Sequence, residues 1–343
     1  MTVDPGARPR PPRMADVARV AGVSHQTVSR VLNGFEAIRP ETRDRVLEAI
    51  EELGYRRNSA ARLLASRRSQ LVGVVTWGSS QFGPANVMLG FEAAARRTPY
   101  QLSTVSVQEI SDQAFQAAVD QLLELAIEAL VVIVPHRAVL RIAQGLRLGI
   151  PVVVVEGDLS ETPLTAGVDN VQGARLATRH LLDLGHEAVT HVAGPADWIE
   201  AMARRDGWQE TLREAGRAVP PLRWGGDWSA RSGYDTGVSL ARETGVTAVF
   251  AANDQMALGL MRALTEQGRA VPGDVSVVGF DDLPEARFFN PSLTTVRQSF
   301  SDLGERAMQL VERVLGGEES PSVELVSPTL IVRESSAPPR RPL

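Results

Sequence analysis

Short apolar runs of strand length alternate with helical stretches from Leu71 almost to the end of this 343-residue chain. This alternation is typical of parallel sheets with helices on both faces. The expected strands are residues 71–76, 101–107, 129–135, 151–156, 188–194, 247–253 and 275–281. The clearest expected helices are residues 115–127, 173–184, 202–215 and 254–267. Because domains usually hold about 100–200 residues, we expect two α/β lobes in succession with a cleft between them.

Residues 14–57 follow a different pattern, which predicts a small helical head behind a disordered Pro- and Arg-rich segment, 1–13. Ser24 suits the cap of a second helix, Gly34 its end, and Pro40 the first turn of a third. The three helices are expected over Met14–Ala21, 25–33 and Pro40–Leu53. The residues expected to pack the core of this head are Val17, Val20, Val28, Val31 and Leu32.

Charge separates the same two parts of the chain. Residues 1–70 carry 13 arginines and 8 acidic residues, whereas the remainder carries 23 arginines and 33 acidic residues. A basic front on an acidic body suggests that the front alone meets a polyanion such as DNA. The alternative is a solvated basic tail with no partner.

The stretch VARVAGVSHQTVSRVLNG, residues 17–34, has the form of a helix-turn-helix. Its turn contains Gly22, and its second helix begins with polar residues that would enter a major groove. The long side chains expected at base edges are His25, Gln26 and Arg30. The short hydroxyls expected on phosphates are Ser24, Thr27 and Ser29. The alternative is a helical hairpin without DNA contacts.

Several longer stretches carry a resemblance to a known family. They are residues 17–33, GYRRN (54–58), GDWSA (226–230), AANDQMALG (251–259), DVSVVGFDD (274–282) and LTTVRQ (293–298). Together they resemble the lactose-repressor (LacI/GalR) family of bacterial transcription regulators over nearly the whole chain. The resemblance implies an α/β class fold: an all-α helix-turn-helix head plus a two-lobed effector domain like a periplasmic sugar-binding protein, with two doubly wound parallel sheets.

The resemblance also assigns DNA contacts to the linker, NSAARLLASRRS at residues 58–69, which is too short and polar to be a stable helix alone. In this family a hinge helix forms here when two subunits sit on operator DNA. A leucine from each subunit then enters the minor groove and kinks the duplex. By motif position that residue is Leu64, with Ala61 on the same helix, and Asn33 and Asn58 are further contact positions. The alternative for Leu64 is a plain interface leucine.

A second set of positions matches the family's effector site. The side chains implied to bind the effector are Arg204, Trp228, Asn253, Gln255, Asp281, Phe300 and Glu156. Asn253 and Asp281 follow expected strands, at the carboxyl ends where ligands of α/β proteins collect. Four of these positions have a structural alternative: a helix cap for Asn253 or Asp281, core packing for Trp228, and an exposed helical position for Arg204.

Three positions depart from the pattern of the family's founding member, so the outline of the ligand is expected to differ. Ile133 replaces a polar asparagine, Glu156 replaces an aspartate and Val168 replaces an aromatic residue. A polyhydroxylated ligand is favoured over a purine, and a galactoside is one candidate.

Other classes find little support in the sequence. Cysteine is absent, as are the glycine-rich dinucleotide and P-loop motifs, and the five histidines form no HExxH motif or recognisable triad. We therefore expect that the protein is not an enzyme and that it binds neither a cofactor nor a metal ion. No apolar run has membrane length, and the N-terminus lacks a signal-peptide core, so we expect a cytoplasmic protein. The rivals are an exported sugar-binding protein and an α/β enzyme.

The sequence thus predicts a repressor that a small sugar releases from a palindromic operator, with a corepressor-type or non-sugar effector as the alternative. We expect a homodimer, because a single head contacts few bases and no leucine heptads end the chain. The expected domains are a tail (1–13), the head (14–57), the hinge (58–69), the two-lobed effector domain (70–337) and a tail (338–343). The first lobe is expected at about 70–168 and 299–327, and the second at about 169–298 and 328–337.

Overall fold

A computed structural model gives the fold of the chain. It describes residues 10, 12–32, 35, 37–55, 68–77, 81–108, 111–133, 136–145, 147–156, 164–318 and 321–340. The chain divides into two compact units, Met1–Ser69 and Gln70–Leu343.

The smaller unit is helical. Its described elements are α1 (Met14–Ala21), α2 (His25–Leu32) and α3 (Pro40–Leu53). Gly22 ends α1 in the left-handed region, at φ 64°, and the Ser24 hydroxyl accepts a 3.1 Å hydrogen bond from the Thr27 N–H at the start of α2. The buried core consists of Val17, Ala18, Ala21, Val28, Val31, Val46, Ala49 and Tyr55.

The prediction that Val20 packs this core is wrong, since Val20 is 40% exposed. The buried positions of α1 are Val17, Ala18 and Ala21, which lie on one side of the helix. Val20 lies about 100° away from the middle of that side at 3.6 residues per turn. Leu32 is partly buried against the core.

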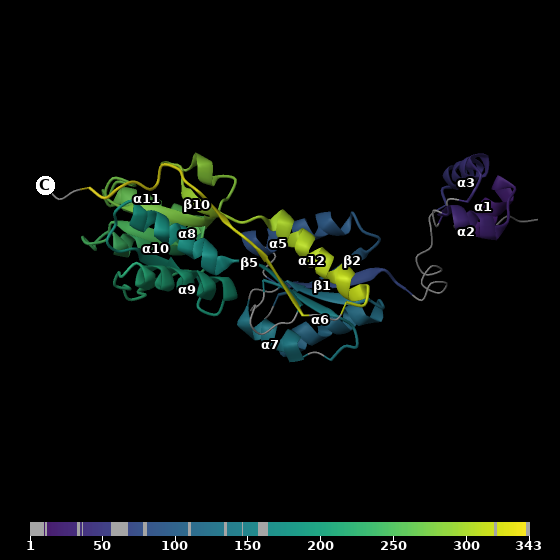
Figure 1. Cartoon of the computed structure of the whole chain (residues 1–343), viewed down its shortest axis with the longest axis horizontal. Helices are drawn as coiled ribbons and strands as arrows, with labels where there is room; N and C mark the ends of the chain where they lie inside the picture. The colour runs from purple at the N-terminus through teal and green to yellow at the C-terminus, as the bar shows by residue number, and fades with distance from the viewer. Residues whose placement is uncertain are drawn as a thin grey trace, which may run out of the picture. The chain divides into compact units, whose positions relative to one another are not determined.

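The larger unit contains two six-stranded sheets, one in each lobe. In the first sheet all paired strands are parallel, in the order β11-β5-β4-β3-β1-β2. Its strands are β1 (Leu71–Trp77), β2 (Gln101–Val107), β3 (Ala129–Ile133), β4 (Val152–Val155), β5 (Leu164–Val168) and β11 (Ser322–Val326). Its helices are α5 (Phe82–Ala95), α6 (Asp112–Glu124), α7 (Arg137–Gly145) and α12 (Phe300–Leu315). One face is covered by α5 and α12 and the other by α6 and α7 (Figure 1).

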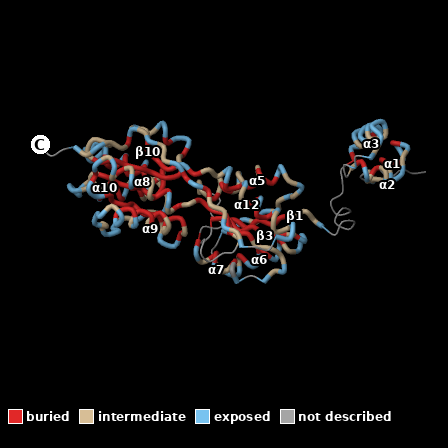
Figure 2. Tube along the Cα trace, in the orientation of Figure 1, coloured by how far each residue is buried: buried red, intermediate tan, exposed pale blue. Residues whose placement is uncertain are grey.

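The second sheet has the order β12-β10-β9-β8-β6-β7, in which β12 alone runs antiparallel to its neighbour. Its strands are β6 (Thr190–Ala193), β7 (Trp224–Gly225), β8 (Ala248–Ala251), β9 (Ser276–Asp281), β10 (Thr294–Arg297) and β12 (Thr329–Ile331). Its helices are α8 (Asn170–Asp183), α9 (Ile199–Glu214), α10 (Ala230–Leu240), α11 (Asp254–Glu266) and the short η1 (Ala286–Phe288). Figure 2 shows the buried chain concentrated in the sheets of both lobes.

The predicted fold class is confirmed: a helical head is followed by two lobes, each built on a mostly parallel sheet. The chain passes between the lobes after β5, after β10 and after β11. The helix expected at residues 115–127 instead covers Asp112–Glu124. It starts early because the Ser111 hydroxyl accepts a hydrogen bond from the Ala114 N–H at 3.1 Å, and Ala126 lies at φ 56°, outside a helix. Among the described residues, no helix is both long and apolar enough to cross a membrane.

Close packing of α5 on α12 depends on two glycines. A Cβ on Gly304 would lie 2.2 Å from the carbonyl carbon of Gly90, too close for these helices to keep their separation. We expect Gly304→Ala to lower the free energy of unfolding by about 1–3 kcal/mol, as overpacking does elsewhere. Urea denaturation measures the change. Gly245→Ala is the control, because a Cβ there meets nothing within 4 Å; equal stability of the two variants would contradict the prediction.

Candidate nucleic-acid interface and interlobe cleft

The polar side chains of α2 divide between solvent and the helix start. His25, Gln26 and Arg30 are exposed, whereas Val28 and Val31 on the opposite side of the helix are buried. Gln26 and Arg30 are four residues apart, so they lie one turn from each other on the exposed face. This face presents the donors and acceptors that base edges require.

The hydroxyls predicted to contact phosphates lie beside this face. Ser24 is exposed, and its hydroxyl lies 2.9 Å from that of Thr27, so both take part in capping α2. Thr27 and Ser29 are half-buried. The other predicted DNA contacts, Asn33, Asn58, Ala61 and Leu64, lie outside the described residues and stay predictions.

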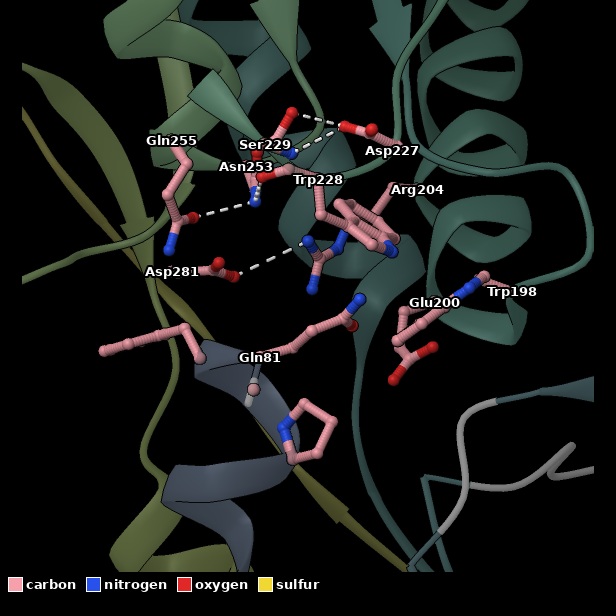
Figure 3. Close-up of a pocket in the computed structure, with 13 residues that line it drawn as sticks. Gln81, Trp198, Glu200, Arg204, Asp227, Trp228, Ser229, Asn253, Gln255 and Asp281 are labelled. Atoms are coloured by element: carbon pink, nitrogen blue, oxygen red, sulfur yellow. Dashed lines mark hydrogen bonds and ion pairs between the residues drawn. The ribbon is translucent and has the colours of Figure 1, made fainter. Parts of the chain in front are cut away.

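A cavity of about 280 Å³ lies between the two lobes. The start of α5 in the first lobe contributes Gln81, Phe82, Gly83 and Pro84. The second lobe contributes Trp198, Glu200, Arg204, Asp227, Trp228, Ser229, Asn253, Gln255 and Asp281, several of them from the carboxyl ends of strands (Figure 3). The position agrees with the usual placement of ligands in α/β proteins. The structure therefore brings five of the predicted effector-site residues around one cavity: Arg204, Trp228, Asn253, Gln255 and Asp281.

Arg204 on α9 is the buried cation of this cavity, not an exposed helical arginine, since it is only 5% exposed. Its Nε donates to Asn170 Oδ1 at 2.8 Å and one terminal nitrogen donates to the Ala252 carbonyl at 2.6 Å. The same nitrogen lies 3.5 Å from Asp281 Oδ1, and the guanidinium lies 3.7 Å from the centre of the Phe280 ring. These contacts fix the guanidinium before any ligand arrives.

Asp281 ends β9 and does not cap the following turn, because the Leu283 N–H donates to Asp254 instead, at 2.8 Å. Its Oδ1 accepts a 2.7 Å hydrogen bond from Gln298. Burial raises the pKa of this carboxyl to about 6, although Arg204 opposes the shift. The backbone of Asp281 lies at φ 111°, a strained conformation that costs about 1–3 kcal/mol. Such strain is common at functional sites.

Asn253 has the capping role that was its structural alternative and also holds the cavity wall. Its Oδ1 accepts a hydrogen bond from the Met256 N–H at 2.9 Å, which caps α11. Its Nδ2 donates to the Trp228 carbonyl at 3.0 Å and to Gln255 Oε1 at 2.8 Å. Asn253 therefore fixes the backbone of Trp228, which lies at φ 74°.

Trp228 forms part of the wall of the cavity rather than of a closed core. Its ring lies over Gly194, where a Cβ would be 2.3 Å from the ring, and its centroid is 5.5 Å from that of Trp198. The buried indole Nε1 has no hydrogen-bond partner among the described residues.

Glu156 and Phe300 line a smaller space of about 20 Å³, which shares Glu200 and Arg204 with the main cavity and also contacts Ile133. Burial raises the pKa of Glu156 to about 7, and Arg204 opposes this shift. The Val168 N–H donates to Glu156 Oε1 at 3.3 Å, so Val168 acts here through its backbone.

Glu200 and Trp198 also line the cavity, and neither was among the residues predicted from the sequence. Glu200 lies on α9 four residues before Arg204, and this spacing on one helix face was the signal that could have revealed it. Glu200 is 9% exposed, and its buried Oε2 has no hydrogen-bond partner among the described residues. Burial, with Glu156 nearby, raises its pKa well above the usual value.

Comparisons with known proteins agree with both parts of this arrangement. Residues 13–58 match a family described as bacterial regulatory proteins, lacI family, and residues 178–336 match a periplasmic binding protein-like domain. The lactose operon repressor of Escherichia coli K12 is 33% identical over 96% of this chain and 92% of its own length. The transcriptional regulator CelR of Thermobifida fusca is 35% identical over 96% of this chain and 99% of its own length.

Solved structures give the same result. The lac repressor dimer bound to operator and the anti-inducer ONPF matches with a TM-score of 0.85 and 31% identity, over 96% of this chain and 100% of that one. The CelR–cellobiose complex matches with a TM-score of 0.71 and 32% identity, over 95% and 100% of the two chains.

A helix-turn-helix head followed by two α/β lobes that enclose a ligand-sized cavity is the architecture of a ligand-responsive transcription regulator. The chain belongs to the lacI family of bacterial regulatory proteins. Its relatives are named as regulators and repressors of transcription, not as enzymes.

Proposed function

We propose that this protein is a homodimeric repressor of the cytoplasm that binds a palindromic operator and is released by a small sugar. The observation that carries the proposal is the exposed polar face of α2, with Gln26 and Arg30 one turn apart over a buried valine core. The names of the relatives support it: one is a lac repressor dimer on operator DNA, and another is a regulator in complex with cellobiose.

The effector is proposed to bind across the interlobe cavity. Arg204, Asp281, Asn253, Gln255 and Trp228 would hold a polyhydroxylated ring, and Glu156 and Phe300 would close its far side. Binding would favour a lobe arrangement that separates the paired heads. Coupling free energies of about 1–3 kcal/mol per site are typical of such responses.

Selection of random duplexes with the purified protein, followed by an effector screen on the winning site, tests this function. We expect a palindromic site and weaker binding in the presence of one or more sugars. Failure to prefer any palindrome over scrambled duplex at near-physiological salt would contradict the proposal. An effector that tightens operator binding would instead identify a corepressor-type response.

Truncation of the recognition face gives a sharper test. We expect Gln26→Ala and Arg30→Ala each to cost about 1–3 kcal/mol in binding to the selected site and to relax its sequence preference at one base pair. Fluorescence anisotropy on matched and mutated duplexes measures both effects. The control is Arg96→Ala, which removes one positive charge from an exposed position of the larger unit. Equal losses in Arg30→Ala and Arg96→Ala would exclude base recognition by Arg30.

A further inference from the structure

Acidic side chains outnumber basic ones around the interlobe cavity. Among the described residues that line the two neighbouring spaces, the basic side chain is Arg204, whereas Glu156, Glu200, Asp227 and Asp281 are acidic. The carboxylate of Asp227 lies at the exposed rim, where it accepts hydrogen bonds from the N–H and hydroxyl of Ser229. The other three carboxyl groups are buried around one guanidinium.

The contacts of Arg204 leave Oε2 of Glu200 without a hydrogen-bond donor. Its nitrogens donate to Asn170 and to the Ala252 carbonyl and lie beside Asp281, whereas no described residue donates to Oε2 of Glu200. An unpaired buried acceptor costs about 1–3 kcal/mol, and more when it is charged. Because Glu200 lines the cavity, a ligand bound there is a possible source of the missing donor.

The carboxyl groups of Glu200 and Glu156 also disfavour ligands that carry a negative charge. A phosphate or carboxylate on the ligand would come close to Glu200 and Glu156 in a site shielded from water, where it would repel the ionised forms of these groups more strongly than in solution. Arg204 offers limited compensation, since its Nε and one terminal nitrogen are already engaged. Hydroxyl or amino donors meet no such obstacle.

We propose that Glu200, together with Glu156, is the specificity determinant of the cavity: it accepts a hydrogen bond from an effector that carries no negative charge, and it excludes phosphorylated and acidic sugars. The inference rests on the proposed function, because it assumes that the cavity holds a sugar-like effector.

Effector binding is then linked to proton release. The titratable and charged groups that face Glu200 are Glu156 across the smaller space, Arg204 on its own helix and Asp281 at the end of β9. Burial raises the pKa of Glu200 and brings that of Glu156 to about 7. A ligand that donates to these carboxylates favours their charged forms and lowers both pKa values. Affinity for an uncharged sugar is therefore expected to rise roughly tenfold from pH 6 to pH 8.

Calorimetric titration of the full-length protein tests the inference. The probes are glucose, galactose, glucosamine, cellobiose and lactose, set against glucose 6-phosphate, galactose 6-phosphate, glucuronic acid and galacturonic acid. We expect a ligand in the first group and none in the second. A sugar phosphate or sugar acid as the tightest ligand would retain the proposed function and overturn this inference. Silence from every probe would count against the proposed function itself, and this inference would fall with it.

Variants test the role of Glu200 directly. We expect Glu200→Gln to weaken the uncharged ligand at least about tenfold at pH 8 and to flatten the pH dependence of its affinity. Glu210→Gln is the matched control, because Glu210 is exposed on the same helix and pairs with Arg175 outside the cavity. Thermal denaturation verifies that both variants fold. An affinity in Glu200→Gln equal to that of the wild type, or a wild-type affinity independent of pH, would overturn the proposal.

Discussion

Replacement of Arg204 by methionine is expected to lower the free energy of unfolding of the larger unit by about 3–5 kcal/mol at pH 8 and to abolish the effector response. Arg204 is 5% exposed, and its positive charge opposes the rise in the pKa of Asp281, Glu156 and Glu200. Methionine fills similar space but leaves these buried carboxylates without a counter-charge and the Ala252 carbonyl without its donor.

Urea denaturation followed by tryptophan fluorescence measures the loss, because all five tryptophans lie in the unit Gln70–Leu343. Arg213→Met is the control, since Arg213 is exposed on the same helix, and we expect it to change stability by less than about 0.5 kcal/mol. The cost in Arg204→Met is expected to shrink at pH 5, where the carboxyl groups take up protons. A loss below about 1 kcal/mol at pH 8 would contradict the assignment of Arg204 as the counter-charge.

The parts of this protein that could be predicted are those set by local pattern. Short apolar runs predict the strands and helices, and capping residues such as Ser24 predict where helices begin. Positions at strand ends are predictable too, because a parallel sheet brings them to one edge; Asn253 and Asp281 meet at the cavity for that reason. The role of Arg204 in the effector site was predicted from the family resemblance, and nothing in the sequence indicated that its side chain is buried.

The parts that could not be predicted depend on packing between distant segments. Glu200 reads as an ordinary acidic residue in the first turn of a helix, and only the approach of the first lobe buries it beside Glu156. Trp198 likewise becomes part of the wall because Trp77 of the first lobe packs against it, with ring centroids 5.5 Å apart. The prediction that Val20 is buried was wrong because a valine on a short helix can face the core or the solvent, depending on how the neighbouring helices pack.

Replacement of Glu156 by glutamine is expected to stabilise the ligand-free protein at pH 8 by about 3 kcal/mol. The pKa of Glu156 is raised from 4.5 to about 7 by burial, so the folded state binds this proton more tightly than the unfolded state. The stability contributed by the group is therefore complete below pH 4.5 and is lost as pH rises through 7. Glutamine does not titrate, so the two proteins differ most at pH 8 and converge near pH 4.5.

Urea denaturation of both proteins from pH 4.5 to pH 8.5 measures this difference. His191 titrates in the opposite sense, because burial lowers its pKa to about 4 and its neutral form becomes costly to keep as pH falls below 6.5. That contribution is common to both proteins and cancels in the difference. A Glu156→Gln variant less stable than the wild type at pH 8 would overturn the prediction. A variant that gains stability while losing affinity for the effector would show that the Glu156 carboxylate serves ligand binding rather than folding. The buried charge would then lower the stability of the ligand-free protein and be compensated by contacts with the bound effector.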